Sequence, residues 1–276
     1  MNRKLTLAMS VGALSGLAGM VINGNKRWDH DTLIAVDDLN AGVPAPNPAM
    51  FVSELPTNLP NVVRRYFDLA LNPDPSSVQM TVLRQKGEIR LGGIDSGWHP
   101  LTASQYFTLP RPGFVWDARV TLCPGVVVRV RYGYCQGGGR MQVSVDGCIP
   151  VVDSHDRTKL ASGALHRYLA EAPWFPSVLR SAVSWQPIDD RTARATLTDG
   201  DTSVWLDFHF GSRGEIVSAS TPGRYRDVDG IAVLTPWKCE YSDYRCVDGE
   251  LIPMSGEAAW RLPHGTLPYC RIRIER

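Results

Sequence analysis

The sequence lacks the local motifs that mark the common catalytic and nucleotide-binding folds. It has no G-x-S-x-G elbow, no H-E-x-x-H pair, no Walker loop and no G-x-G-x-x-G run that opens a helix. Its six cysteines include no C-x-x-C pair, and its histidines do not have zinc-finger spacing. We therefore expect no metal site and no other cofactor.

The sequence also lacks an excess of charge of either sign. There are 29 basic and 28 acidic residues, which leaves a formal net charge of +1. A balanced chain has no overall field that would attract nucleic acid or an acidic surface. A nucleic-acid partner is therefore not expected.

One long uncharged run stands near the N-terminus, at residues 5–22, directly after Arg3 and Lys4. Its length lies between a signal-peptide core and a membrane span. We predict that residues 1–22 form an export signal or a retained membrane anchor, rather than a buried core helix. This places the protein in a bacterial cell envelope, with membrane contact through residues 5–22. Residues 23–55 are expected to form an extended linker, because they contain clustered prolines and few large apolar residues.

The rest of the chain, residues 56–276, is predicted to be a single domain. Apolar residues recur at helical spacing in residues 59–71 and 156–172. Elsewhere they alternate with polar residues, as Phe114, Trp116 and Ala118 do. Strands do not alternate with helices, which argues against a Rossmann or TIM fold. The predicted strands are residues 78–91, 104–109, 114–122, 126–132, 141–145, 182–186, 192–197, 203–210, 215–220, 237–246, 251–262 and 267–274.

This order predicts a mainly β fold with a few helices (α+β). Its core would be a large, strongly curved antiparallel sheet, a half-barrel, with two helices covering its hollow side, because a sheet this wide must curl, split or close. Between the two sets of strands lies the stretch from Tyr168 to Pro176. There we expect Pro173 and Pro176 to end a helix and restart the sheet.

Aromatic residues are the main candidates for lining the hollow. Core packing accounts for most tryptophans in proteins, and the remainder can form an apolar pocket with a few polar anchors. The residues that we predict to contact a hydrophobic small molecule or lipid are Trp116, Tyr132, Tyr168, Trp174, Phe175, Trp185, Trp205 and Trp237.

Glu171 is the carboxylate with most catalytic potential. Burial against the apolar helix face would raise its pKa and make it an acid–base, with His99 or His209 as partner. The alternative is an ion pair with Arg167, four residues earlier on the same helix. Three functions stay open: binding of a hydrophobic or lipid-like ligand, a hydrolase or lyase acting on an apolar small molecule, and a scaffold with a self-filled core.

The cysteines also leave alternatives open. In an oxidising compartment Cys123 could bridge to Cys135, or Cys239 to Cys246. Alternatively, each thiol is a small buried hydrophobe.

A set of spaced sequence blocks carries a resemblance to a known family. The blocks are Phe114–Ala118, Gly137–Met141, His166–Glu171, Trp174–Pro176, Val183–Trp185, Ile188–Asp189, Arg194–Thr196, Pro236–Trp237, Ile252–Pro253 and Trp260–Pro263. They resemble a bacterial family defined by a domain of unknown function, over roughly residues 59–276. That resemblance implies no activity and no catalytic residue. More loosely, the layout is similar to the half-barrels of periplasmic lipoprotein carriers, which hold acyl chains against an incurved sheet.

Overall fold

The computed structural model of the chain describes residues 3–43, 58–71, 79–109 and 111–275. These residues form a 13-stranded antiparallel sheet in the order β6-β5-β4-β3-β2-β1-β13-β12-β11-β10-β9-β8-β7. The strands are β1 (Met80–Ile89), β2 (His99–Thr108), β3 (Gly113–Cys123), β4 (Val126–Cys135), β5 (Gly138–Val145), β6 (Ile149–Asp156), β7 (Val183–Asp189), β8 (Thr192–Asp199), β9 (Thr202–Phe210), β10 (Ile216–Val228), β11 (Ile231–Val247), β12 (Glu250–Leu262) and β13 (Gly265–Glu275).

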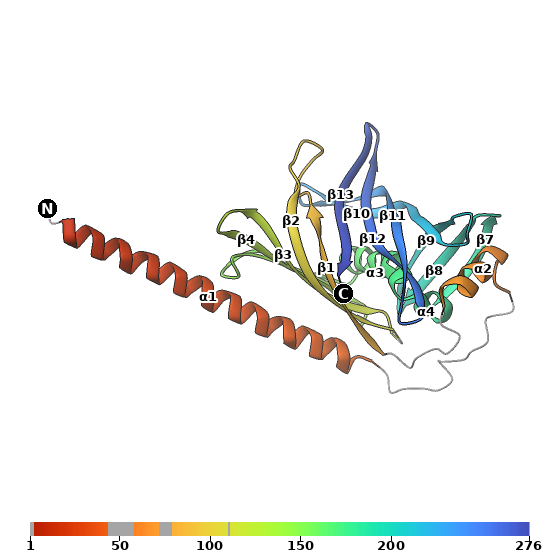
Figure 1. Cartoon of the computed structure of the whole chain (residues 1–276), viewed down its shortest axis with the longest axis horizontal. Coiled ribbons are helices and arrows are strands. Elements are labelled where there is room, and N and C mark those ends of the chain that lie inside the picture. Colours follow the sequence, from red (N-terminus) through yellow and green to blue (C-terminus); the bar gives the residue numbers. More distant parts are fainter. Residues whose placement is uncertain (1–2, 44–57, 72–78, 110, 276) are drawn as a thin grey trace.

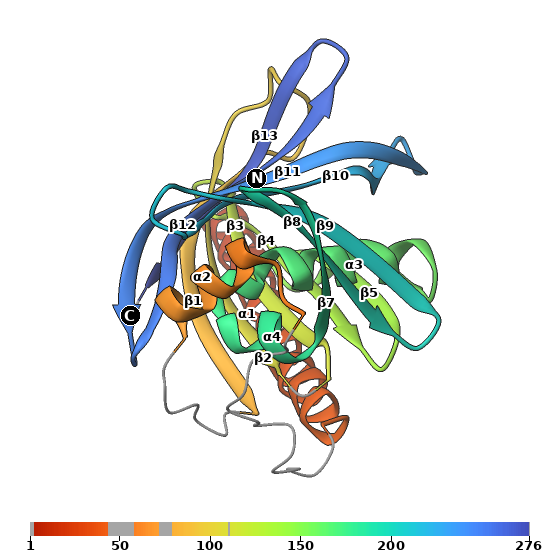
Figure 2. The same ribbon diagram turned by 90° about the vertical axis from the view of Figure 1, so that its right-hand side faces the viewer.

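The sheet is strongly curved but stays open in the described part of the chain, where β6 and β7 are its edges. Its helices are α1 (Arg3–Ala41), α2 (Asn61–Ala70), α3 (Lys159–Glu171), the 3-10 turn η2 (Ala172–Trp174) and α4 (Pro176–Ser181). All but α1 lie within the curve, whereas the C-terminal half of α1 lies along the opposite face of β2, β3 and β4 and its N-terminal part projects beyond the sheet (Figures 1 and 2). The predicted half-barrel is confirmed, with more helices than the two that were expected.

The core follows from the alternation seen in the sequence. Phe114 and Ala118 of β3 are fully buried on the hollow side, whereas Asp117 and Arg119 point to the other face. Helix α3 contacts β4, β5 and β6 on one arm of the sheet and β9 and β10 on the other. Its apolar side chains, such as Leu165, thus fill the space between two arms that are distant in strand order.

The expectation that Pro176 restarts the sheet was wrong. Pro176 is the first residue of α4, and β7 begins only at Val183. Proline is favoured at the first position of a helix, because its fixed φ suits the turn and the missing N–H would have no partner there. Val178 and Leu179 of α4 are buried, so this added turn contributes to the core.

The extended linker predicted for residues 23–55 was wrong over residues 23–41, which belong to the continuous helix α1. Residues 44–55 lie outside the described residues. Trp28, Thr32 and Leu39 recur at helical spacing, and all are buried against the sheet. The sequence-based prediction missed this buried stripe because it placed helices only on the hollow side of the sheet and expected the outer side to be solvent-exposed.

Polar contacts hold α1 in place. Trp28 donates its indole N–H to Asp117 Oδ1 (2.8 Å), and fully buried Arg129 donates to Asp29 Oδ1 (2.7 Å). The helix comes so close to the turn after β5 that a Cβ added at Gly24 would lie 2.9 Å from the carbonyl oxygen of Gly147. This docking is therefore specific, and residues 24–39 of α1 cover part of the outer face of the sheet.

Among the described residues, no helix combines the length and apolar character needed to cross a membrane. The signal or anchor role of residues 1–22 therefore stays a prediction. Within the described ranges all six cysteines are free, so neither of the disulfides considered from the sequence is formed.

Candidate functional site

A chain of buried polar side chains crosses the hollow side of the sheet. Trp116 donates to Gln85 Oε1 (2.8 Å), Gln85 donates to Gln105 Oε1 (2.8 Å), and Gln105 donates to Glu171 Oε2 (2.6 Å). Arg167 completes the chain by donating Nε–H to Glu171 Oε1 (2.8 Å). Glu171 therefore faces the hollow, and both of its oxygens accept hydrogen bonds, as a buried carboxylate requires.

The partners of Glu171 match the structural alternative rather than the catalytic one. Arg167 lies over the rings of Trp116 (4.3 Å), Phe114 (5.5 Å) and Tyr132 (5.6 Å), so the ion pair is enclosed by aromatic rings. Protein donors thus occupy both carboxylate oxygens of Glu171, as expected for a structural ion pair. The pair fixes α3 to β3 and β4.

Neither candidate histidine meets Glu171 in the described part of the chain. His209 is on the face of β9 opposite to buried Phe208 and Phe210, where its Nδ1 lies 3.1 Å from Thr192 Oγ1. His99 is the first residue of β2, whereas the Glu171 partner Gln105 lies further along the same strand. The acid–base pair considered from the sequence is therefore not assembled.

The predicted aromatic residues fall into separate groups. Tyr168 and Phe175 fill the deep part of the hollow: Tyr168 donates its O–H to Thr108 O (2.7 Å), and the Phe175 ring lies 4.3 Å from that of Phe107. Trp174 is also buried beside them. This part of the hollow is thus filled by the chain itself.

The other predicted aromatics lie further apart. Trp185 packs on Phe208 (5.7 Å between ring centroids) beneath the β7 edge and donates to Leu179 O (2.9 Å). Trp205 lies on the opposite face of the sheet, where the Arg194 guanidinium covers its ring at 3.6 Å. Trp116 and Tyr132 flank Arg167, whose guanidinium lies 4.3 Å and 5.6 Å from their rings. Trp237 belongs to the group described next.

A group of four residues, which we name the Arg224 cradle, gathers on the hollow side of β10–β13. Its members are Arg224, Trp237, Trp260 and Tyr269. The Arg224 guanidinium lies over the rings of Trp237 (4.8 Å) and Trp260 (5.8 Å), and the Trp260 and Tyr269 rings are stacked at 5.5 Å. Arg224 Nη1 and Trp237 Nε1 both donate to the Tyr269 hydroxyl oxygen, each at 3.0 Å.

Two irregularities in strand pairing create this arrangement. The β10–β11 register shifts between Thr221 and Arg224, and the β12–β13 register shifts so that Tyr269 has no directly paired residue. An extra residue in one strand reverses which side chains face inward. The shifts therefore turn Arg224 and Tyr269 into the hollow, where regular alternation would point them away.

The electrostatics of the cradle are unusual. Arg224 is only 8% exposed, yet no carboxylate of the described residues forms an ion pair with it. Its Nη2 donates to Gly163 O of α3 (3.2 Å), and its Nε has no acceptor within the described ranges. Burial and the nearby Arg224 charge together lower the pKa of His166 on α3 to about 4, so this imidazole is neutral at physiological pH.

Beside the cradle, the inner wall of the sheet is not fully covered. Tyr132, Met141 and Val143 on one arm remain partly exposed although they pack on the core. The same is true of Ala258 and Cys270 on the other arm. Partial exposure on a core-facing surface means that solvent reaches into this half of the hollow.

The thiols on this wall have an apolar environment. Burial raises the pKa of Cys239 to about 12 and that of Cys270 to about 11. Both side chains nevertheless keep some accessible surface. Within the described residues, no group of three or more His, Cys, Asp or Glu side chains is placed to hold a metal ion.

Comparison with known proteins places the domain in a family. Residues 57–276 match the model described as a family of unknown function, DUF6920. The chain belongs to this family. The family resemblance found in the sequence blocks is therefore confirmed, and the match covers all 13 strands of the sheet.

Solved structures also match this DUF6920 member, at low similarity. One is a LolA superfamily protein from Nitrosomonas europaea, with 12% identity, a TM-score of 0.38, and coverage of 78% of this chain and 90% of that chain. Another is a β-barrel-like protein of domain of unknown function DUF1849 from Brucella abortus, with 11% identity, a TM-score of 0.20, and coverage of 72% and 95%. A search of the curated proteins finds no match.

The Arg224 cradle of this DUF6920 member was missed in the sequence, although a signal was present. The predicted strand, residues 215–220, ended just before Pro222 and Gly223. In the structure β10 continues through them to Val228. Proline and glycine within a strand mark a bulge, so the segment Thr221–Arg224 could have been predicted as an irregular strand that re-aims one side chain.

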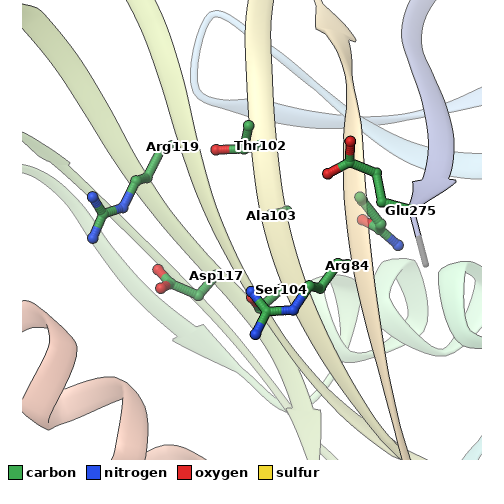
Figure 3. Close-up of a pocket in the computed structure, with 8 residues that line it drawn as sticks. Arg84, Thr102, Ala103, Ser104, Asp117, Arg119 and Glu275 are labelled. Carbon is green, nitrogen blue, oxygen red and sulfur yellow. The ribbon is translucent and has the colours of Figure 1, made fainter.

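A shallow pocket of about 230 Å³ lies on the outer face of the sheet beside α1 (Figure 3). Arg84, Ser104 and Asp117 lie in one row across β1, β2 and β3. Arg119 is about half exposed there. Mixed charge and open exposure make this a solvated surface, and no predicted ligand-binding residue lines it.

Proposed function

We propose that this protein binds a hydrophobic or lipid-like ligand in the open half of its hollow. The observation that carries the proposal is the partly exposed, core-facing wall formed by Tyr132, Met141, Val143, Ala258 and Cys270. Apolar surface that faces inward but stays accessible favours an apolar occupant, since burying it releases roughly 25 cal/mol per Å².

The self-filled scaffold has support in the deep half of the same hollow. Tyr168, Trp174 and Phe175 pack there with little exposure and leave that half to the protein's own side chains. The proposed ligand therefore lies beside α3 rather than beneath it. The acid–base function is not proposed, because Glu171 pairs with Arg167 and Gln105.

The test is a binding experiment with a lipid that reports contact. Dibromostearate quenches tryptophan fluorescence on contact, and Trp260 lies at the proposed site. We expect saturable quenching by the wild-type protein, together with a lipid in the organic-solvent extract of the purified protein.

Matched variants locate the ligand. Ala258→Phe fills the wall between Cys239 and Cys270 on the neighbouring strands and is expected to abolish quenching. Ala232→Phe, near the β10–β11 hairpin, is expected to leave quenching unchanged. Folded wild-type protein that shows no saturable quenching and carries no lipid contradicts the proposal.

We also propose that the protein is located in the bacterial cell envelope, as the uncharged run at residues 5–22 indicates. Residues 1–55 fused to alkaline phosphatase, which is active only after export, test this location. An inactive fusion with soluble cytoplasmic protein would reject it.

A further inference from the structure

The Arg224 cradle contains hydrogen-bond donors that have no acceptor. Arg224 Nε is buried without a partner among the described residues. The Tyr269 oxygen already accepts hydrogen bonds from Arg224 and Trp237, so both of its acceptor positions are used and its own hydrogen remains to be donated. A buried unsatisfied donor costs about 1–3 kcal/mol, more when charged, so such a cluster needs an explanation.

The positive charge of Arg224 likewise has no carboxylate within salt-bridge distance among the described residues. The side chain is more than nine-tenths buried, and its contacts are a backbone carbonyl, a hydroxyl and aromatic faces. Buried guanidinium groups are usually paired with a carboxylate or a phosphate. Here the described part of the chain supplies no such partner within salt-bridge distance.

Gly163 of α3 lies next to the cradle, because its carbonyl oxygen accepts from Arg224. A Cβ added there would lie 3.6 Å from the Tyr132 hydroxyl, which is an ordinary contact distance, so an alanine would fit. Glycine within a helix costs about 1 kcal/mol relative to alanine. Glycine at this position therefore leaves a gap of about one methyl group between α3 and the Tyr132 hydroxyl, beside the carbonyl that accepts from Arg224.

From this arrangement we propose that the Arg224 cradle is an anion subsite for the head of an amphiphilic ligand. The head carries negatively charged oxygens, as a carboxylate or a phosphate does. They accept from Arg224 Nε and the Tyr269 hydroxyl, with the Tyr132 hydroxyl at the edge of the gap. The apolar tail lies along the wall of Ala258 and Cys270. This inference rests on the proposed function and names its ligand class.

The experiment compares charged and uncharged probes in the full-length protein. Dibromostearate and its methyl ester share one tail, and the ester has no charge. A charge-assisted hydrogen bond contributes about 1.5–3 kcal/mol, so wild-type protein is expected to bind the acid at least about tenfold more tightly than the ester. Arg224→Met keeps the side-chain volume without the charge and is expected to bring the two affinities within about twofold.

The control is Arg261→Met, an exposed arginine on the same sheet next to Trp260. It is expected to keep the preference for the acid. Competition with lysophosphatidate identifies the head: stronger displacement than by stearate assigns a phosphate, and weaker displacement assigns a carboxylate.

The outcomes separate the two proposals. Equal wild-type affinity for acid and ester overturns the anion subsite and leaves the hydrophobic-ligand function standing, whereas binding of neither probe overturns that function as well. If Arg224→Met does not fold, Tyr269→Phe decides, because it removes the hydroxyl and keeps the ring. A Tyr269→Phe protein that prefers the acid as strongly as wild type does overturns the subsite.

Discussion

Acid is expected to destabilise this protein through one histidine on α3. His166 is 6% exposed, and its ring lies next to the Arg224 charge. Its Nδ1 lies 2.9 Å from Ser162 O, so Nδ1 carries the hydrogen of the neutral imidazole. Because the folded state disfavours the charged ring, the unfolded state binds the proton more readily as pH falls.

The direction and size follow from the two pKa values. The ordinary value is 6.5 and the folded value is about 4, so stability is highest above pH 6.5 and falls as pH drops through this window. The full linkage amounts to roughly 3 kcal/mol, of which roughly 2.5 kcal/mol is lost by about pH 4.5. That loss is a large part of the stability of a typical domain.

Urea unfolding at a series of pH values measures the effect. Asn at position 166 keeps a donor for Ser162 O but does not titrate. The stability of His166→Asn relative to wild type is therefore expected to rise by roughly 2.5 kcal/mol between about pH 7 and pH 4.5. His155→Asn, at an exposed position on β6, is the control and should run parallel to wild type. If the His166→Asn and wild-type curves are also parallel, the reasoning is refuted.

Two further predictions concern the outer face and the inner wall. Arg129→Leu removes a fully buried partner of Asp29 and Asp117 and is expected to cost roughly 3 kcal/mol in urea unfolding. Arg119→Leu, at a 3.5 Å exposed pair, should cost less than about 1 kcal/mol, and equal losses would show that α1 is not held by the buried charge. The pKa values of Cys239 (about 12) and Cys270 (about 11) are raised, so iodoacetamide at pH 8 is expected to alkylate both thiols far more slowly than exposed Cys123. Mass spectrometry over a time course measures the three rates, and comparable rates would contradict an apolar wall.

The sequence alone indicated the half-barrel and most of its strands, although the edge strand β6 was not predicted. Alternation of apolar and polar residues in segments such as Phe114–Ala118 indicates which face of a strand is buried. This pattern is local, so it can be recognised without knowing which strands pair. The amphipathic helices α2 and α3 were also predicted from a local pattern, the recurrence of apolar residues at helical spacing. The half-barrel followed from the number of predicted strands, because a sheet that wide must curl, split or close. The family was also visible in the spaced blocks, which the match over residues 57–276 confirms.

Tertiary structure decided the inward aim of Arg224 and Tyr269, because each depends on a register shift against a neighbouring strand. It decided the pairing of Glu171 with Gln105, which is 66 residues away in sequence, and so separated the carboxylate from the histidines. It also placed Trp28 against Asp117, 89 residues further along, and so turned an expected tether into a docked helix. Local patterns report burial, but contacts between distant segments depend on how a curved sheet closes around its helices.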